Sequence, residues 1–594
     1  MLDGRIYRAA FVPLLLAVLV AAFALAERPR PIGTTLAADA FDGRRAFATL
    51  EQLRRTFPNR RPGSPGDDAL ARRVEQELRA TFGAGGSSVR VSRAPAETID
   101  GEASLTTVVA ERVGREERRL VVVAQRDAAG TEEAARLSGT AALLELARLF
   151  EGRALRRTVT FVSASGGTGG MDGVRDALRG LDGPTDAVLV LGDLAGAHAR
   201  RPMVVPWSES AGIAPIRLRR TVEQAVREET ELDPGSPRAL AQLIRLAVPV
   251  TLTAQGPAGA LGLSAVTLSV SGERGPAAGT EVSRARLEAF GRATLRSISA
   301  LDNGPDVPSG PREYLVVQRR ALPRWTVFML AGLLLLPALL GAVDGLARVR
   351  RRREPVAIWL RWLAAAAAPF LLGALVARLL GLAGVVPSLA GAADPQVVDV
   401  DVAALVSVGV AVLLGFVLRG PVGQLLGVPR RPRDGGPYPS GAAAAIGVVL
   451  SLLAVGVWFV NPYTALLLAP AVHLWLLAAV PEVRLPRVAL VAMVLAGLLP
   501  ALAVGLYYSA QFGLDPLELA WMSVLLLAGG YAGAVGVVGW SVVLACGVGA
   551  LSVAVRKRRR AVHRDGDTPP VTIRGPVSYA GPGSLGGTES ALRH

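Results

Sequence analysis

Cysteine, lysine and histidine are nearly absent from this chain of 594 residues. Its one cysteine, Cys546, lies in an apolar run, which excludes a disulfide-based scaffold. Lys557 is the only lysine, so arginine carries nearly all of the positive charge, a bias typical of a GC-rich bacterial genome. Aromatic residues make up only 5% and do not alternate with the basic clusters, which excludes a nucleic-acid partner despite the net charge of +16.

Hydrophobic residues make up 51% of the chain, too many for a largely disordered protein. The mean hydropathy of +0.39 is too high for a soluble globular protein and too low for one embedded throughout in a bilayer. It predicts a soluble domain joined to a bundle of transmembrane helices. The excess of arginine then reflects cytoplasmic loops, which collect basic residues in membrane proteins.

The first apolar run, residues 9–26, is just long enough to cross a bilayer core of about 30 Å. We interpret it as an uncleaved anchor; a signal peptide is the alternative, and both export the segment that follows. No comparable run occurs in residues 27–323. Further spans are predicted near 325–346, 356–384, 402–418, 441–460, 463–480 and 488–508, with a last one ending near 555.

Arginine clusters follow every second span, whereas the other loops have no arginine and several acidic residues. The positive-inside rule therefore predicts eight spans in a bacterial cell membrane, with both termini in the cytoplasm. Residues 519–555 could hold two spans; we expect one span and an interfacial or re-entrant stretch. The expected parts are a cytoplasmic N-terminus (1–8), an anchor (9–26), an extracytoplasmic domain (27–323), a bundle of about seven helices (324–555) and a basic tail (556–594) that is disordered from His563.

Strand-like and helix-like segments alternate in the predicted exported domain. Strands are expected at 104–112, 120–125, 158–163, 187–191 and 263–270, and helices at 139–150, 173–181 and 283–301. This alternation predicts a three-layer α/β fold with a mostly parallel sheet. Sites in such sheets form at the carboxyl ends of the strands, which points to 125–127, 163–170 and Asp193.

Seven segments of the domain core, 60–305, share their order and spacing with one enzyme family. They are Arg61–Ser64, Thr107–Ala110, Leu120–Asp127, Ser138–Arg148, Arg157–Val162, Leu191–Gly196 and a last strand and helix from Ser264 to Asp302. Together they resemble the M28 zinc exopeptidases, the aminopeptidase and glutamate-carboxypeptidase-like family. Joined to a membrane bundle, the layout also resembles the GPI transamidase attachment subunit and the M28-like peptidases of the ER membrane.

The resemblance implies a site of two zinc ions, held by two histidines and three carboxylates, with a further glutamate as general base. The family's first histidine falls on Gln125, and its bridging aspartate falls on Ala135. Its last histidine falls near Gly279. Asp193 stands at the terminal carboxylate ligand and is the only one of the five ligands that is retained.

The catalytic base and the remaining carboxylate ligand are also replaced. The family's pair of glutamates falls on Gly167 and Thr168, neither of which can act as a charged base. Asp127 stands where the family orients its histidine; without that partner, we expect a solvated or capping residue. His198 is the only histidine in 27–323, and we expect it to be exposed, so two imidazole ligands cannot assemble there.

These losses predict a pseudo-peptidase that binds a peptide, an envelope molecule or a partner enzyme outside the cytoplasm. Concave sites at strand ends often persist, so we expect the former cleft to remain a pocket. No cofactor is expected. The alternatives are an active aminopeptidase with an altered zinc site, for which zinc would be needed, and a transporter-like bundle with a receptor domain.

Weaker candidates lie elsewhere in the chain. The glycines of 166–170 suggest a phosphate-binding loop, but they lack the Gly-Lys-Ser/Thr ending. A triad of Ser163 or Ser165 with His198 lacks the Gly-x-Ser-x-Gly motif. In the bundle, Arg378 and His473 are candidates, because ionisable groups inside spans are costly. Besides the lipid bilayer, we expect a protein partner in the membrane or envelope.

Overall fold

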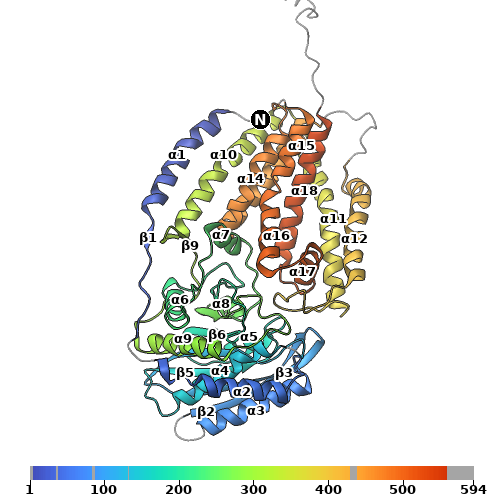
Figure 1. The fold of residues 1–594 in the computed structure, drawn as a ribbon. Helices are drawn as coiled ribbons and strands as arrows, with labels where there is room; N and C mark the ends of the chain where they lie inside the picture. Colours follow the sequence, from blue (N-terminus) through green and yellow to red (C-terminus); the bar gives the residue numbers. More distant parts are fainter. Residues whose placement is uncertain are drawn as a thin grey trace, which may run out of the picture.

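The computed structural model describes residues 4–34, 38–82, 87–131, 133–428, 438–483 and 485–557. Figure 1 shows two parts stacked end to end, an α/β domain at the bottom and a bundle of long helices above it. The basic tail beyond Lys557 lies outside the described residues, as do Arg430, Arg431, Arg433 and Arg484, which belong to the arginine clusters used for the predicted topology.

A mixed seven-stranded sheet forms the centre of the α/β domain, in the order β2-β3-β5-β4-β6-β8-β7. Its strands are β2 (Ser87–Thr98), β3 (Gly101–Arg112), β4 (Glu116–Gln125), β5 (Arg157–Ala164), β6 (Thr185–Leu191), β7 (Val204–Val205) and β8 (Ala265–Leu268). The four central strands, β5, β4, β6 and β8, run parallel, whereas β2, β3 and β7 pair antiparallel.

The prediction of a mostly parallel sheet is therefore wrong at both edges. Only two residues, Ile99 and Asp100, join β2 to β3, and so short a connection can link only antiparallel strands. Between β4 and β5 the chain instead returns through a helix, which is the crossover that a parallel pair requires.

Helices cover both faces of this sheet, as the three-layer prediction requires. The first face packs against α2 (Gly43–Thr56), α3 (Pro65–Phe82), α4 (Ser138–Phe150), α6 (Ile216–Thr230) and α9 (Arg284–Asn303). The second packs against α5 (Asp172–Arg179) and α8 (Gln255–Ala260). Alternation along β4 serves both cores, because Leu120 and Val122 enter the first and Val121 and Val123 the second.

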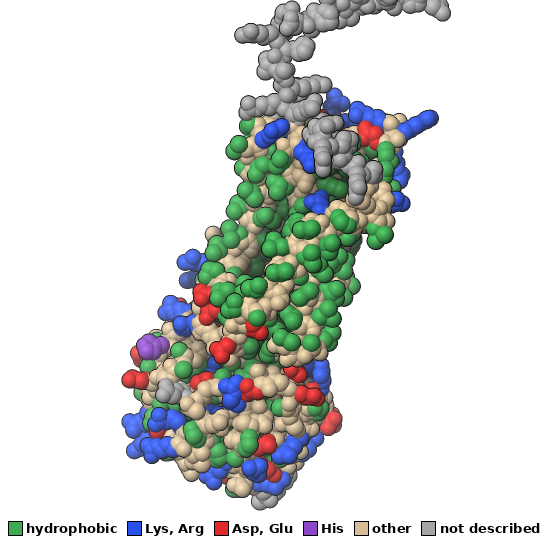
Figure 2. Space-filling model, turned by 90° about the vertical axis from the view of Figure 1, so that its right-hand side faces the viewer, with side chains coloured by type: hydrophobic (Ala, Val, Ile, Leu, Met, Phe, Trp, Pro, Cys, Tyr) green, Lys and Arg blue, Asp and Glu red, His purple; other side chains and the backbone are tan. Residues whose placement is uncertain are grey.

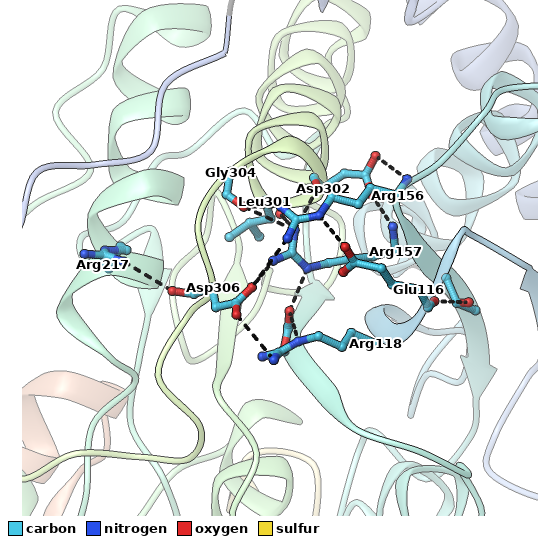
Figure 3. A network of polar contacts seen from close by, with 11 residues as sticks. Glu116, Arg118, Arg156, Arg157, Arg217, Leu301, Asp302, Gly304 and Asp306 are labelled. Atoms are coloured by element: carbon cyan, nitrogen blue, oxygen red, sulfur yellow. Dashed lines mark hydrogen bonds and ion pairs between the residues drawn. The ribbon is translucent and has the colours of Figure 1, made fainter.

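At the amino edge of the parallel strands, a buried arginine ties the sheet to α9 (Figure 3). Arg157, 1% exposed, begins β5 and donates from Nε to Asp186 at 2.6 Å and from Nη2 to Asp306 at 2.7 Å. Its Nη1 donates to the carbonyl oxygens of Leu301 and Asp302 in the last turn of α9. A cation at this end also complements the helix dipole.

The bundle contains seven described helices that are long and apolar enough to cross a membrane. They are α1 (Gly4–Phe23), α10 (Arg324–Arg351), α11 (Ala357–Leu382), α12 (Val402–Leu425), α13 (Ser440–Val460), α14 (Pro462–Ala479) and α18 (Ala534–Arg556). Figure 2 shows apolar side chains over the shaft of the bundle, with charged side chains at its far end and over the α/β domain. Length and composition thus match a membrane protein.

The seventh expected span, 488–508, is a broken helix. α15 (Arg487–Ala496) and α16 (Leu499–Phe512) meet at an angle of 43°. Pro500 lies in the first turn of α16, where its missing N–H stops the continuation of a hydrogen-bonded helix from α15. The shorter α17 (Pro516–Ala528) precedes α18, so residues 519–555 hold one long helix and one short apolar helix.

A small antiparallel sheet joins the two parts. It consists of β1 (Ala26–Glu27), β10 (Arg320–Pro323) and β9 (Tyr314–Val317), so the segments next to α1 and α10 are paired. The helix α7 (Ala239–Ala247) reaches into the bundle, where Leu246 packs with Tyr463 of α14. The α/β domain is thus fixed to the helices by more than its covalent links.

Candidate functional site

Asp127, just beyond the end of β4, is a buried residue that caps the neighbouring loop. Its Oδ1 accepts the N–H of Gly167 at 2.9 Å, and its Oδ2 accepts the N–H and the hydroxyl of Thr168 at 2.9 Å each. The side chain is 2% exposed, so the capping prediction fits its position and the solvated one does not. All three of these donors belong to the loop that follows β5.

The family's histidine and base positions face each other across the same edge. A Cβ atom at Gly167 would lie 2.4 Å from Cδ of Gln125. The Gln125 side chain therefore fills the space that a side chain at position 167 would need. The Gln125 amide donates from Nε2 to Sδ of Met171 at 2.8 Å. A glutamate at position 167 would require Gln125 to move.

Asp193 follows β6 and stabilises the turn that begins there. Its Oδ1 accepts the N–H groups of Ala195 at 3.0 Å and Gly196 at 2.7 Å. Ser138 links this turn to the position of the bridging aspartate, because its hydroxyl donates to the carbonyl oxygen of Ala135 and accepts the N–H of Leu194. Burial raises the pKa of Asp193, and these amide hydrogen bonds only partly offset that effect.

The structure brings four of the seven predicted cleft residues to one cavity, Gln125, Asp127, Gly167 and Asp193. Thr168 and Ala135 lie beside it, and Gly279 lies in an exposed turn with φ of 71° outside its lining. The cavity measures about 50 Å³. Small-molecule sites are usually several hundred Å³, so the expected open pocket is largely filled.

The bundle covers this edge of the domain. The segment between α11 and α12 lies on the glycine-rich loop after β5, where Ala393 forms a β-bridge with Gly169 and Leu389 lies beside Gly170. Arg274, which lines the cavity, hydrogen-bonds Gln396 of the same segment. The loops beside the cavity are therefore covered by the segment between α11 and α12.

A fully buried ion pair of the α/β domain lies where the domain contacts the bundle, a contact region that we call the seam. Arg245 of α7 pairs with Glu273, and both side chains are 0% exposed. The guanidinium also donates from Nε to the Tyr507 hydroxyl at 3.0 Å and lies 5.0 Å from the ring centre of Tyr508. Aromatic faces and a carboxylate together stabilise a cation that has no access to water.

A second buried pair joins Asp67 to Arg126, which lies between Gln125 and Asp127 in the chain. Nε of Arg126 lies 2.7 Å from Oδ1 of Asp67, and Ser165 donates to the other oxygen at 2.6 Å. Burial raises the pKa of Asp67, and Arg126 opposes that effect. Sequence reasoning missed both pairs; the signal available was a charged Arg126 directly after an apolar strand.

The donor set at the carboxyl edge does not fit zinc. Within the described residues, no group of three or more His, Cys, Asp or Glu side chains could hold a metal ion. Asp193 and Asp127 have backbone amides as partners, and Gln125, Gly167 and Ala135 provide no charged ligand. His198 is exposed, as expected, and lies outside the lining of the cavity.

The two membrane candidates have structural partners. Arg378 of α11 donates to the carbonyl oxygen of Ala528 at the end of α17 and to the Ser388 hydroxyl at 3.3 Å, so it caps a helix rather than extending toward lipid. His473 of α14 bonds through Nε2 to the carbonyl oxygen of Leu334 at 3.0 Å and through Nδ1 to the Tyr7 hydroxyl at 3.2 Å. It thereby joins three helices.

No family model matches the chain, and no curated protein sequence matches it. Similar solved structures include a glutaminyl cyclase from Porphyromonas gingivalis, at 16% identity and a TM-score of 0.31 over 43% of this chain and 98% of that one. A leucine aminopeptidase precursor from Bacteroides thetaiotaomicron has 16% identity and a TM-score of 0.34 over 46% and 99%. BSAP, a zinc aminopeptidase from Bacillus subtilis, has 12% and 0.33 over 43% and 94%. At these TM-scores the similarity carries no conclusion about activity.

Proposed function

We propose that this chain is a multi-pass bacterial membrane protein with an extracytoplasmic, peptidase-like domain that binds rather than hydrolyses. The observation that carries the proposal is how Asp127 and Asp193 are used. Both carboxylates stand at positions where the M28 family orients or binds zinc, and both accept hydrogen bonds from backbone amides of neighbouring turns. These acids stabilise loops.

Zinc chemistry gives the proposal its second support. A catalytic zinc needs three protein ligands that are neutral histidines or carboxylates, and a hydrolase of this type also needs a general base. Gln125 has an amide in place of the imidazole, and Gly167 has no side chain in place of the base. With those positions changed, the remaining Asp193 cannot hold a metal alone.

The covered edge supports binding at another surface. A peptide would have to displace the segment around Leu389 and Ala393 from the glycine-rich loop before it reached Gln125. The cavity behind that segment has about 50 Å³, enough for one or two water molecules. The partner, a peptide, an envelope molecule or an enzyme, would then dock on the outer faces of the domain.

Metal content and turnover of the purified full-length protein test this function. After equilibration with zinc and removal of free metal, we expect substoichiometric zinc and no release of p-nitroaniline from amino-acid p-nitroanilides. Near-stoichiometric zinc together with turnover would instead establish an active aminopeptidase with an altered site. Asp193→Ala is the matched variant, because an active enzyme would lose both metal and activity with it.

A further inference from the structure

A second, larger cavity lies on the α/β domain near the bundle and is strongly basic. It has a volume of about 510 Å³ and lies between α6, residues 233–239 and the β9–β10 turn. We call it the Arg28 pocket. The arginines that line it are Arg28, Arg220, Arg227, Arg238 and Arg319.

The two acidic residues of the Arg28 pocket already have other partners. Glu223 accepts from Nε of Arg219 at 2.5 Å, and Asp233 lies 3.6 Å from Arg201. Neither Arg219 nor Arg201 lines the pocket. In the part of the chain that the structure describes, none of the five lining arginines forms an ion pair with an acidic residue, and five guanidiniums face two carboxylates in the lining, so the pocket keeps an excess of positive charge.

The polar contacts of these arginines hold them in place without neutralising them. Arg28 donates from Nε to the carbonyl oxygen of Arg319 at 2.7 Å, and Arg220 donates from Nη1 to that of Pro29 at 2.5 Å. Arg227 donates to the side-chain oxygen of Gln224 at 3.0 Å. Desolvation and the nearby Arg220 guanidinium lower the pKa of Arg28, as expected where cations converge.

The pocket lies close to both chain segments that enter the bundle. Arg28 follows the last residue of α1, Phe23, by five positions, and Arg319 precedes the first residue of α10, Arg324, by five. Five residues span at most about 17 Å. If the helices cross a membrane, the pocket lies within reach of the headgroups of the outer leaflet.

We propose that the Arg28 pocket binds a phosphate group, such as that of an anionic phospholipid headgroup or of a free phosphate anion. Arginine is the side chain best suited to phosphate, because its planar fork can donate two parallel hydrogen bonds to one anion. Gln224 and Ser236 add further polar groups to the lining. The proposal rests on the proposed function in one respect, the placement of the helices in a membrane. It does not depend on whether the domain hydrolyses peptides.

Binding to the purified full-length protein tests the proposal with two probes. In the first, inorganic pyrophosphate is titrated into detergent-solubilised protein and the heat of binding is measured. In the second, the protein is placed in nanodiscs of phosphatidylglycerol or of phosphatidylcholine, and hydrogen exchange of peptides from the Arg28 pocket is compared. A response to pyrophosphate supports a free phosphate ligand, and protection by phosphatidylglycerol alone supports a lipid headgroup. Neither arm depends on zinc or turnover, so the result is independent of the test for hydrolysis.

Two variants and a control make the outcome decisive. Arg220→Gln removes a half-buried guanidinium, and Arg238→Gln removes an exposed one, so we expect the second variant to keep the fold. Each should weaken binding roughly tenfold, as expected for one charged hydrogen bond. Arg179→Gln, an exposed arginine of α5 outside the pocket, should leave binding unchanged. Absence of binding to both probes, or equal losses in Arg238→Gln and Arg179→Gln, would overturn the proposal.

Discussion

At the amino edge of the sheet, Arg157 joins two strands and a helix end through charged hydrogen bonds, whereas at the carboxyl edge Asp127 and Asp193 accept backbone amides of single turns. At the first edge the central contact is thus between opposite charges, whereas at the second Asp127 and Asp193 accept hydrogen bonds from uncharged groups. In a working metalloenzyme the carboxyl edge would hold the metal instead.

The difference shows two uses of buried carboxylates at opposite ends of one sheet. Asp127 and Asp193 at the carboxyl edge accept N–H groups that burial would otherwise leave without partners. Another carboxylate of that edge, Glu273, pairs with Arg245, and Arg245 in turn contacts Tyr507 and Tyr508 of the bundle. The same edge therefore serves assembly, while the amino edge serves the folding of the domain itself.

Arg157→Ala should have the largest effect on the amino edge. It leaves Asp186, 4% exposed, with only the partly exposed Arg118 as a cationic partner and removes the contacts to the end of α9. Loss of one partner of a buried pair costs about 3–5 kcal/mol of unfolding free energy. Chemical denaturation of the full-length protein, followed by hydrogen exchange of β5 peptides, measures it. Arg118→Ala should cost less than about 1 kcal/mol, and equal losses would contradict this assignment.

Arg245→Met should lower the unfolding free energy by about 3 kcal/mol, because it leaves Glu273 buried without its cation and removes the contacts of Arg245 with Tyr507 and Tyr508. We expect faster hydrogen exchange in the glycine-rich loop after β5 and in the segment between α11 and α12. Adding Glu273→Gln should restore most of the loss, since no uncompensated charge then remains. A double variant with a lower unfolding free energy than Arg245→Met alone would show that the unpaired charge of Glu273 is not the cause of the loss.

The internal architecture of the domain follows closely from sequence pattern. Apolar alternation places β4 between two layers, and helical spacing of apolar residues identifies α4 and α9. The carboxyl ends of strands also identify where Gln125, Asp127 and Asp193 meet, because parallel strands end at one edge. These features depend on local periodicity.

The seam could not be predicted in this way. The bridge between Gly169 and Ala393 joins residues more than two hundred positions apart, and hydropathy identifies a span without specifying what its loops contact. The pair of Arg245 and Glu273 was missed for the same reason, since each alone resembles a solvated charge. The small volume of the cavity depends on the packing of Gln125 against Gly167. The residue types at these two positions do not by themselves predict that packing.

Glu209 makes the seam sensitive to pH. Its carboxylate lies 2.9 Å from Nη2 of Arg175 and beside Gly391, while Asp172 pairs with the same arginine and the Tyr531 hydroxyl contacts the Glu209 backbone. Burial raises the pKa of Glu209 from 4.5 to about 7, although Arg175 opposes the shift. The folded state therefore binds the proton more tightly than the unfolded state does.

The unfolding free energy should accordingly fall as pH rises from about 4.5 to 7, by up to about 3 kcal/mol. Glu209→Gln keeps the shape of the side chain without its charge and should flatten this dependence. Thermal unfolding of both proteins across pH 4 to 8 measures the difference. Glu228→Gln, at an exposed position of α6, is the control. Parallel pH profiles of wild type and Glu209→Gln would refute the prediction.

Asp127→Asn should give the smallest effect. It distinguishes a structural role of Asp127 from a role in orienting a metal ligand. Asparagine keeps one acceptor oxygen but presents an NH2 group to the donors of Gly167 or Thr168, so the loss should be about 1–2 kcal/mol. If this edge is structural, hydrogen exchange of the glycine-rich loop rises and zinc content does not change. If zinc binding falls with the substitution, Asp127 orients a metal ligand, and the contrast between the two edges of the sheet disappears.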